Sequence, residues 1–266
     1  MAAAESSRKD GTAHGFTLVE LVVVLAIIAV LTHLAVKAAW RFRDKELAKA
    51  ADRQLEDIRD CIYKRSADGR AEGFLADMGR LPRLDGGTLS ELWKMPTNAL
   101  AYAVRRAVAP NLCPNTPEAP NVFVPTGWRG AYLRLPAGKS RLYDPWGNTV
   151  EATDDAGFVR VAESNGFAVA VSHYGPGAKA SDGTHVDLVP DGGASSRLVV
   201  MADADAEVAW FGPCDGLVTG AVSHVSAASP AVFDGLTPGE RVLVVSGKAR
   251  TLDVRPGDNL VSLELQ

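Results

Sequence analysis

The chain has 266 residues, of which 47% are hydrophobic and 23% are charged, with 25 glycines, 15 prolines and 3 cysteines. This composition is too apolar for a disordered protein and too poor in cysteine for a disulfide-rich scaffold. The net charge of −4 argues against a surface that binds nucleic acid, and we expect no nucleic-acid partner. The length allows one large domain or two smaller ones.

The first element is an apolar run from Phe16 to Ala39, with no polar side chain between Leu21 and Leu31. At about 1.5 Å per residue, a helix of this length crosses a hydrocarbon core about 30 Å thick. A cleaved secretory signal is the alternative, but the run is longer than its usual apolar region and Glu20 interrupts its start. We therefore predict a membrane-spanning helix at 16–39.

The helix is expected to continue beyond the membrane. No proline occurs before Pro82, and apolar residues recur at spacings of three and four along one helical face. These residues are Leu47, Ala51, Leu55, Ile58 and Ile62. The segment Ser-Ala-Asp-Gly at 66–69 is a stop signal, so the outer part of the helix is predicted over 40–68, with its stripe buried.

Glu20 has two interpretations. Thr17 and Glu20 have the spacing of a capping box, in which the two side chains bond to free backbone N–H groups of the first helical turn. Alternatively, a carboxylate at the edge of an apolar helix pairs with a cation from another molecule, because ionisable groups in membranes are costly and usually functional.

The sequence GFTLVE at 15–20, followed by the long apolar run, resembles the cleavage and methylation signal of type IV prepilins and type II secretion pseudopilins. The resemblance implies that residues 1–15 are a leader, that a prepilin peptidase cuts between Gly15 and Phe16, and that the new amine of Phe16 is methylated. It also makes Glu20 an assembly residue, whose carboxylate is neutralised by the amine of an adjacent subunit. Many pilins carry a proline within the apolar helix, which this chain lacks.

The same resemblance implies the partners and the location. The partners are other pilin or pseudopilin subunits, the prepilin peptidase and an inner-membrane assembly platform. The protein is expected in the inner membrane as a single-pass protein, with its C-terminal domains in the periplasm. The positive charges at Lys37, Arg41, Arg43 and Lys45 favour the opposite topology, and the processing signal is taken to override them.

Residues 69–190 are predicted to form a globular domain. Short helices or turns are expected at 73–82, 89–93 and 100–108, a proline-rich loop at 110–125, and strands at 131–135, 150–152, 157–162 and 167–174. The sequence DPWGN at 144–148 has the composition of a tight turn.

Three motifs extend the resemblance to the major pseudopilin type: FLADMGRLP at 74–82, GWRGAYL at 127–133 and DPWGN. In that type the DPWGN turn leads into a small antiparallel sheet, and the loop after the sheet often binds calcium. Here that loop offers only Asp182, Asp187 and Asp191, whereas calcium takes six to eight oxygen ligands. A metal-free loop is therefore favoured over a calcium site.

A second domain is expected at 197–266. From residue 191 onward acidic residues outnumber basic ones ten to five, and a glycine- and serine-rich segment at 191–196 marks a boundary. Strand-like runs follow at 198–201, 207–211, 217–225, 241–245, 249–254 and 259–265. The predicted fold class is α+β: a pilin-like long N-terminal helix packed on a small antiparallel sheet, followed by an all-β, sandwich-like domain.

The sequence contains no motif for catalysis. No GxSxG motif or zinc-ligand spacing occurs, so we expect a protein without enzymatic activity or a required cofactor. Export permits one disulfide between two of Cys61, Cys113 and Cys214, and the spacing does not choose the pair. The leading functional hypothesis is a structural subunit of a periplasmic filament in a type II secretion-like system, and the alternative is a minor type IV pilin with a binding domain at the filament tip.

Overall fold

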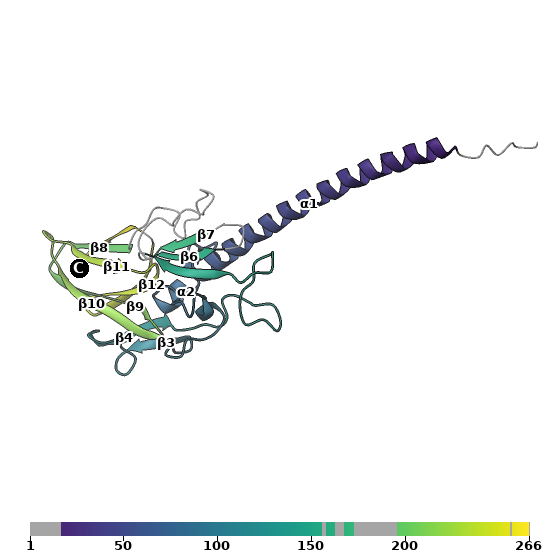
Figure 1. The fold of residues 1–266 in the computed structure, drawn as a ribbon. Helices are drawn as coiled ribbons and strands as arrows, with labels where there is room; N and C mark the ends of the chain where they lie inside the picture. Colours follow the sequence, from purple (N-terminus) through teal and green to yellow (C-terminus); the bar gives the residue numbers. More distant parts are fainter. Residues whose placement is uncertain (1–16, 156–157, 163–167, 173–195, 256, 266) are drawn as a thin grey trace, which may run out of the picture. The chain divides into compact units, whose positions relative to one another are not determined.

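The computed structural model describes residues 17–155, 158–162, 168–172, 196–255 and 257–265 (Figure 1). The chain divides into two compact units, Met1–Leu47 and Ala48–Gln266. A long N-terminal helix is followed by antiparallel sheets and a β-rich C-terminal region, which confirms the predicted α+β class.

Helix α1 runs from Leu18 to Ile62 and contains 45 residues. It ends before the predicted stop at 66–69, because a hairpin of β1 (Lys64–Arg65) and β2 (Ala71–Glu72) begins two residues after Ile62. Four positions of the predicted outer stripe are buried, at Ala51, Leu55, Ile58 and Ile62. The periodicity therefore identified the buried face correctly.

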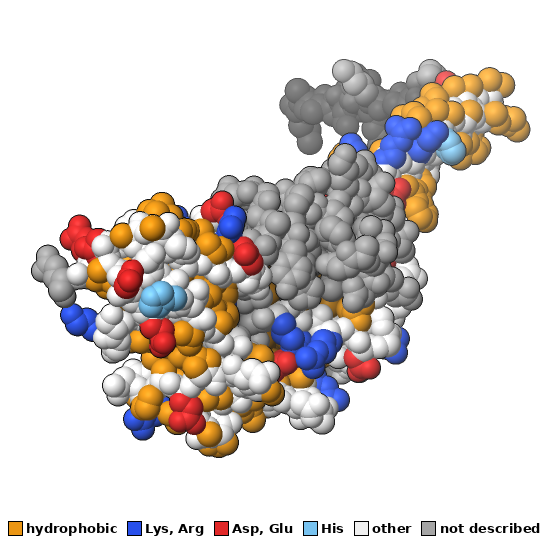
Figure 2. Space-filling model, turned by 90° about the vertical axis from the view of Figure 1, so that its left-hand side faces the viewer, with side chains coloured by type: hydrophobic (Ala, Val, Ile, Leu, Met, Phe, Trp, Pro, Cys, Tyr) orange, Lys and Arg blue, Asp and Glu red, His pale blue; other side chains and the backbone are white. Residues whose placement is uncertain are grey.

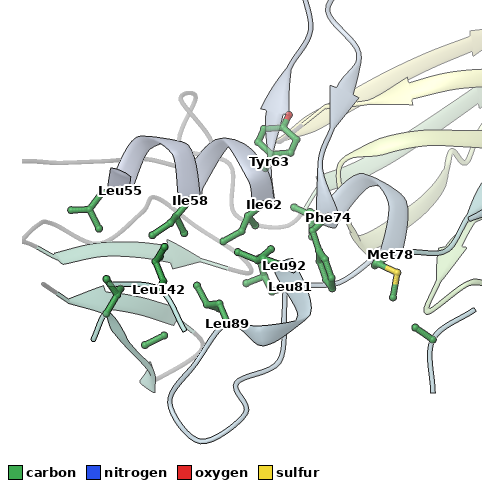
Figure 3. Close-up of a cluster of buried hydrophobic side chains, with 14 residues drawn as sticks. Leu55, Ile58, Ile62, Tyr63, Phe74, Met78, Leu81, Leu89, Leu92 and Leu142 are labelled. Carbon is green, nitrogen blue, oxygen red and sulfur yellow. The ribbon is translucent and has the colours of Figure 1, made fainter. Parts of the chain in front are cut away.

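The first core of the second unit forms around this stripe (Figure 3). Leu55, Ile58 and Ile62 of α1 share one apolar cluster with α2 (Phe74–Met78) and the 3-10 helix η1 (Ser90–Leu92). Leu142 and Ala152 complete the cluster on the side of the following sheet. The end of α1 is thereby anchored through apolar contacts that contribute on the order of 2 kcal/mol for each fully buried large side chain.

The DPWGN sequence forms the predicted turn. The Asp144 carboxylate accepts hydrogen bonds from the backbone N–H groups of Trp146 at 3.0 Å and Asn148 at 2.8 Å. Gly147 takes a positive φ of 94°, and its N–H donates to the Asp144 carbonyl at 2.9 Å. The Asp144 side chain thus satisfies the turn's own backbone donors.

The turn leads into a three-stranded antiparallel sheet. Strands β5 (Glu151–Asp155), β6 (Phe158–Ala162) and β7 (Ala168–Ser172) lie in the order β5-β6-β7. The strands expected at 150–152, 157–162 and 167–174 are confirmed within the described residues. The strand expected at 131–135 is wrong, because that segment runs irregularly and lays Tyr132 and Leu133 against the first core.

Two further predictions are wrong. Residues 100–108, expected as a short helix or turn, contain strand β3 (Ala103–Ala107), and the proline-rich loop contains strand β4 (Ala119–Thr126). The pair is antiparallel, and Pro125 of β4 lies opposite Val104 of β3. A two-stranded sheet has only edge strands, where a proline without an N–H group is tolerated.

Within the described residues, the C-terminal region contains seven strands. They are β8 (Ser196–Ala202), β9 (Ala206–Cys214), β10 (Leu217–Val225), β11 (Ala231–Leu236), β12 (Gly239–Val245), β13 (Lys248–Val254) and β14 (Asp258–Leu263). One sheet has the order β10-β9-β12-β13, and the other has the order β11-β8-β14, with β14 parallel to β8. All six predicted strands are present, and β11 was missed.

The two C-terminal sheets enclose a shared core. Leu198 and Phe233 from one sheet lie in the same buried cluster as Val208 and Leu243 from the other. The arrangement has the face-to-face layers of a sandwich.

The β3–β4 hairpin packs on the C-terminal sheet through a separate cluster. Val122 and Val124 of β4 lie with Phe211, Val218 and Val242. Residues on both sides of the expected boundary at 191–196 therefore share a core. The separate domains at 69–190 and 197–266 stay a prediction.

Candidate functional site

The start of α1 holds the capping box expected from the sequence. One oxygen of the Glu20 carboxylate, Oε2, accepts hydrogen bonds from the Thr17 backbone N–H and hydroxyl, both at 2.9 Å. The Glu20 backbone N–H donates to the Thr17 hydroxyl at 3.2 Å. The other carboxylate oxygen, Oε1, has no hydrogen-bond partner among the described residues. The cap therefore leaves half of the carboxylate open to another molecule.

The surface of α1 in the first unit is apolar and exposed. Every residue from Thr17 to Glu46 is exposed, including leucine, valine and isoleucine side chains that are more than half accessible. Figure 2 shows hydrophobic side chains on the visible face of this helix. The helix is long and apolar enough to cross a membrane. An apolar surface of this extent needs lipid or protein around it, because soluble proteins rarely expose large apolar patches.

Basic and aromatic side chains follow the apolar run. Lys37, Arg41 and Lys45 occur at spacings of four residues and line a groove of about 310 Å³ on α1, together with Phe42. Lysine, arginine and aromatic residues commonly sit at the boundary between lipid and water, where an apolar stem and a polar end are both satisfied. The groove is suited to a membrane interface.

Several predicted site residues lie outside the described part of the chain. They are Gly15 and Phe16 at the predicted cleavage site, and Asp182, Asp187 and Asp191 in the loop considered for calcium. Among the residues that the structure does describe, no group of three or more His, Cys, Asp or Glu side chains could hold a metal ion.

The structure also contains ionic clusters that the sequence analysis missed. Arg80 donates to both oxygens of Glu91, at 2.6 and 3.1 Å, and also to Asp215. Arg83 donates to the second oxygen of Asp215 at 3.0 Å. Asp215 lies in the β9–β10 turn, so this network ties that turn to the segment after α2.

A second cluster surrounds Asp77 of α2, whose residue is only 5% exposed. Its carboxylate accepts hydrogen bonds from Arg129 at 2.7 Å and from the Tyr132 hydroxyl at 3.0 Å. Burial raises the pKa of Asp77, and the two donors oppose this shift. Asp77 and Arg129 line a cleft of about 500 Å³ with Glu240 and Asp253. Because the Asp77 carboxylate is paired with Arg129 and Tyr132, we interpret this cluster as a structural contact and not as a catalytic site.

One comparison with known proteins identifies the N-terminal segment. The family model of the prokaryotic N-terminal methylation motif matches residues 12–36. No curated protein and no solved structure is significantly similar to the chain.

The match supports one class of protein. Together with the apolar helix, the methylation motif supports a type IV pilin-like or pseudopilin protein, a structural class whose members are processed by a prepilin peptidase and assemble with other pilin subunits. It also supports anchoring of α1 in the inner membrane.

Proposed function

We propose that the chain is a pseudopilin-like structural subunit of a periplasmic filament in a type II secretion-like system. A prepilin peptidase removes residues 1–15 and methylates the amine of Phe16. Residues 16–39 then hold the subunit in the inner membrane until it joins the filament. The observation that carries the proposal is the methylation motif on a helix whose apolar surface is exposed from Thr17 to Glu46.

Assembly in this proposal depends on the open side of the Glu20 carboxylate. The cap occupies Oε2, and Oε1 is left for the amine of a neighbouring subunit's Phe16. In a lipid or helix-bundle environment an unpaired carboxylate is costly, so the pairing favours one axial offset between adjacent helices. The apolar surface supplies contact area, and the ion pair selects the register.

The remainder of the chain lies in the periplasm in this proposal, although the basic residues after the membrane segment favour the cytoplasm. External protease applied to spheroplasts tests the orientation. Digestion of residues 48–266 in spheroplasts, with a cytoplasmic marker left intact, supports export. Protection of this part until the membrane is lysed refutes it.

Processing is tested on the full chain produced with and without a prepilin peptidase. We expect a mature protein that begins at Phe16 and carries a methyl group on its amine, detected by mass spectrometry of the first peptide. A different first residue in the presence of an active peptidase refutes the proposal.

The role of Glu20 is tested by two substitutions that separate capping from charge. Glutamine supports a capping box as glutamate does, whereas alanine does not. We expect Glu20→Gln and Glu20→Ala both to be processed and both to lose filament assembly. Asp44→Ala, an exposed acidic position on the same helix, is the control and should assemble normally. Normal assembly of Glu20→Gln would show that the cap alone matters.

The second candidate, a minor pilin with a binding domain at the filament tip, is favoured by the seven-stranded C-terminal region. Antibody labelling of filaments separates the two functions. Labelling along the whole filament supports the repeating subunit, and labelling restricted to one end supports the tip protein.

A further inference from the structure

The three cysteines have different surroundings. Cys61 lies on α1, and its thiol donates to the Tyr132 carbonyl at 2.8 Å. Its burial raises the pKa of the thiol to about 11. Neither Cys113 nor Cys214 is among its contacts in the described residues.

Cys113 and Cys214 lie next to each other although 101 positions separate them in the sequence. Cys214 is the last residue of β9, and Cys113 lies in the segment between β3 and β4. The Cys113 sulfur is 3.8 Å from the Cys214 carbonyl oxygen, and the two thiols contact each other. Burial, together with this contact, raises the pKa of Cys113 to about 12.

The backbone on both sides fixes this proximity. The Cys113 N–H donates to the Val218 carbonyl at 2.8 Å, and the Val218 N–H donates to the Asn111 carbonyl at 2.8 Å. Val218 belongs to β10, whose first residue, Leu217, pairs with Cys214 across the β9–β10 turn. The neighbouring thiols are therefore held by regular hydrogen bonding and not by a chance contact of mobile side chains.

We propose that Cys113 and Cys214 form the disulfide of this protein and that Cys61 remains a thiol. The thiolate of one cysteine attacks a disulfide of an exchange oxidant and forms a mixed disulfide. One sulfur of the oxidant leaves as a thiolate in this step. The second cysteine, as its thiolate, attacks the protein sulfur of the mixed disulfide, so the protein S–S bond forms and the oxidant's second sulfur leaves as a thiolate; glutathione disulfide thus gives two molecules of glutathione. Two protons and two electrons leave the protein, and the oxidant gains both electrons.

The bond has a clear structural consequence. It joins the β3–β4 loop covalently to the end of β9, next to the turn in which Asp215 binds Arg80 and Arg83. The turn is then held by an ionic network on one side and by a covalent link on the other. In the cell the bond needs an oxidising compartment, and in that respect it rests on the proposed export.

The pairing is tested first on the purified full-length chain in detergent, treated with glutathione disulfide. Free thiols are alkylated under denaturing conditions and the peptides are mapped. We expect a linked pair of peptides containing Cys113 and Cys214, alkylated Cys61, and a loss of two of the three titratable thiols. Alkylation of Cys113 and Cys214 after this treatment, or a link that involves Cys61, overturns the proposal.

Single variants provide the matched controls. Cys61→Ser should keep the linked pair, while Cys113→Ser and Cys214→Ser should each show no intramolecular link. Loss of the link in Cys61→Ser would overturn the assignment. Because the wild-type peptide map already decides the pairing, poor folding of a variant does not obscure the result.

The same map on protein alkylated in intact cells separates this inference from the proposed function. A Cys113–Cys214 link in both samples supports the pairing and export together. A link in the oxidised purified protein alone supports the pairing and counts against export.

Discussion

Replacement of Gly79 by alanine tests whether the β9–β10 turn is packed tightly against the end of α2. Gly79 has a φ of +70°, and a Cβ atom there would lie 2.0 Å from the Pro213 carbonyl oxygen. Real Cβ contacts are essentially never shorter than 3.0 Å, so the end of β9 that leads into the turn must move by about 1 Å. That movement disturbs the hydrogen bond from the Asp215 N–H to the Met78 carbonyl, which is 2.9 Å long.

The expected cost has three parts. The left-handed backbone costs alanine about 1 kcal/mol, the lost hydrogen bond about 1 kcal/mol, and the weakened Arg80–Asp215 pair a further ~1 to 2 kcal/mol. We expect Gly79→Ala to lose about 3 to 4 kcal/mol of unfolding free energy.

The control is Gly138→Ala, because Gly138 has a similar φ of +76° and a Cβ there meets nothing within 4 Å. It should lose only about 1 kcal/mol. Denaturant unfolding of both full-length variants in detergent, followed by tryptophan fluorescence, measures the difference. Equal losses in the two variants would refute the tight contact.

Three further predictions concern the same unit. Ile58→Ala should lower the unfolding free energy by about 2 to 5 kcal/mol, since Ile58 is fully buried in the first core; a loss below 1 kcal/mol in denaturant unfolding would contradict that packing. Asp215→Asn should cost about 1 to 2 kcal/mol, whereas Asp234→Asn, which removes the charge of an exposed pair, should cost less than about 0.5 kcal/mol. For Asp77, whose pKa is raised by burial, ionisation costs stability. The unfolding free energy of the wild type should therefore be highest relative to that of Asp77→Asn at acid pH, below the ordinary aspartate pKa of about 3.9. This difference should be lost as the pH rises through the folded-state pKa of Asp77. Unfolding curves across this pH range measure the difference, and a difference that widens in favour of the wild type with rising pH would contradict the prediction.

Local patterns predicted the parts of the fold that depend on local chemistry. The spacing of Leu55, Ile58 and Ile62 identified the buried face of α1, and the composition of DPWGN identified the turn at Asp144. Alternation and β-branched residues located six of the seven C-terminal strands. The Thr17–Glu20 spacing predicted the cap, because a capping box involves residues only three positions apart.

The remaining features depend on contacts that are distant in sequence. Strand β4 contains Pro120 and Pro125, and only its position in a two-stranded sheet makes these prolines acceptable. The Arg129–Asp77 pair joins residues 52 positions apart, and its charges look like ordinary surface charges in the sequence. The pairing of cysteines 113 and 214 likewise needed the fold, since three cysteines allow three pairs.

The parallel pairing of β14 with β8 bears on how the protein is made. Asn259 lies beside Leu198, and Leu263 lies beside Ala202. Strand β8, the first strand of the C-terminal region, can therefore pair with β14 only after about sixty further residues have been synthesised. Until β14 leaves the ribosome and, if exported, the translocation channel, one edge of β8 is uncovered and able to bind a strand of another chain. A holdase that shields this edge would be most useful during that interval.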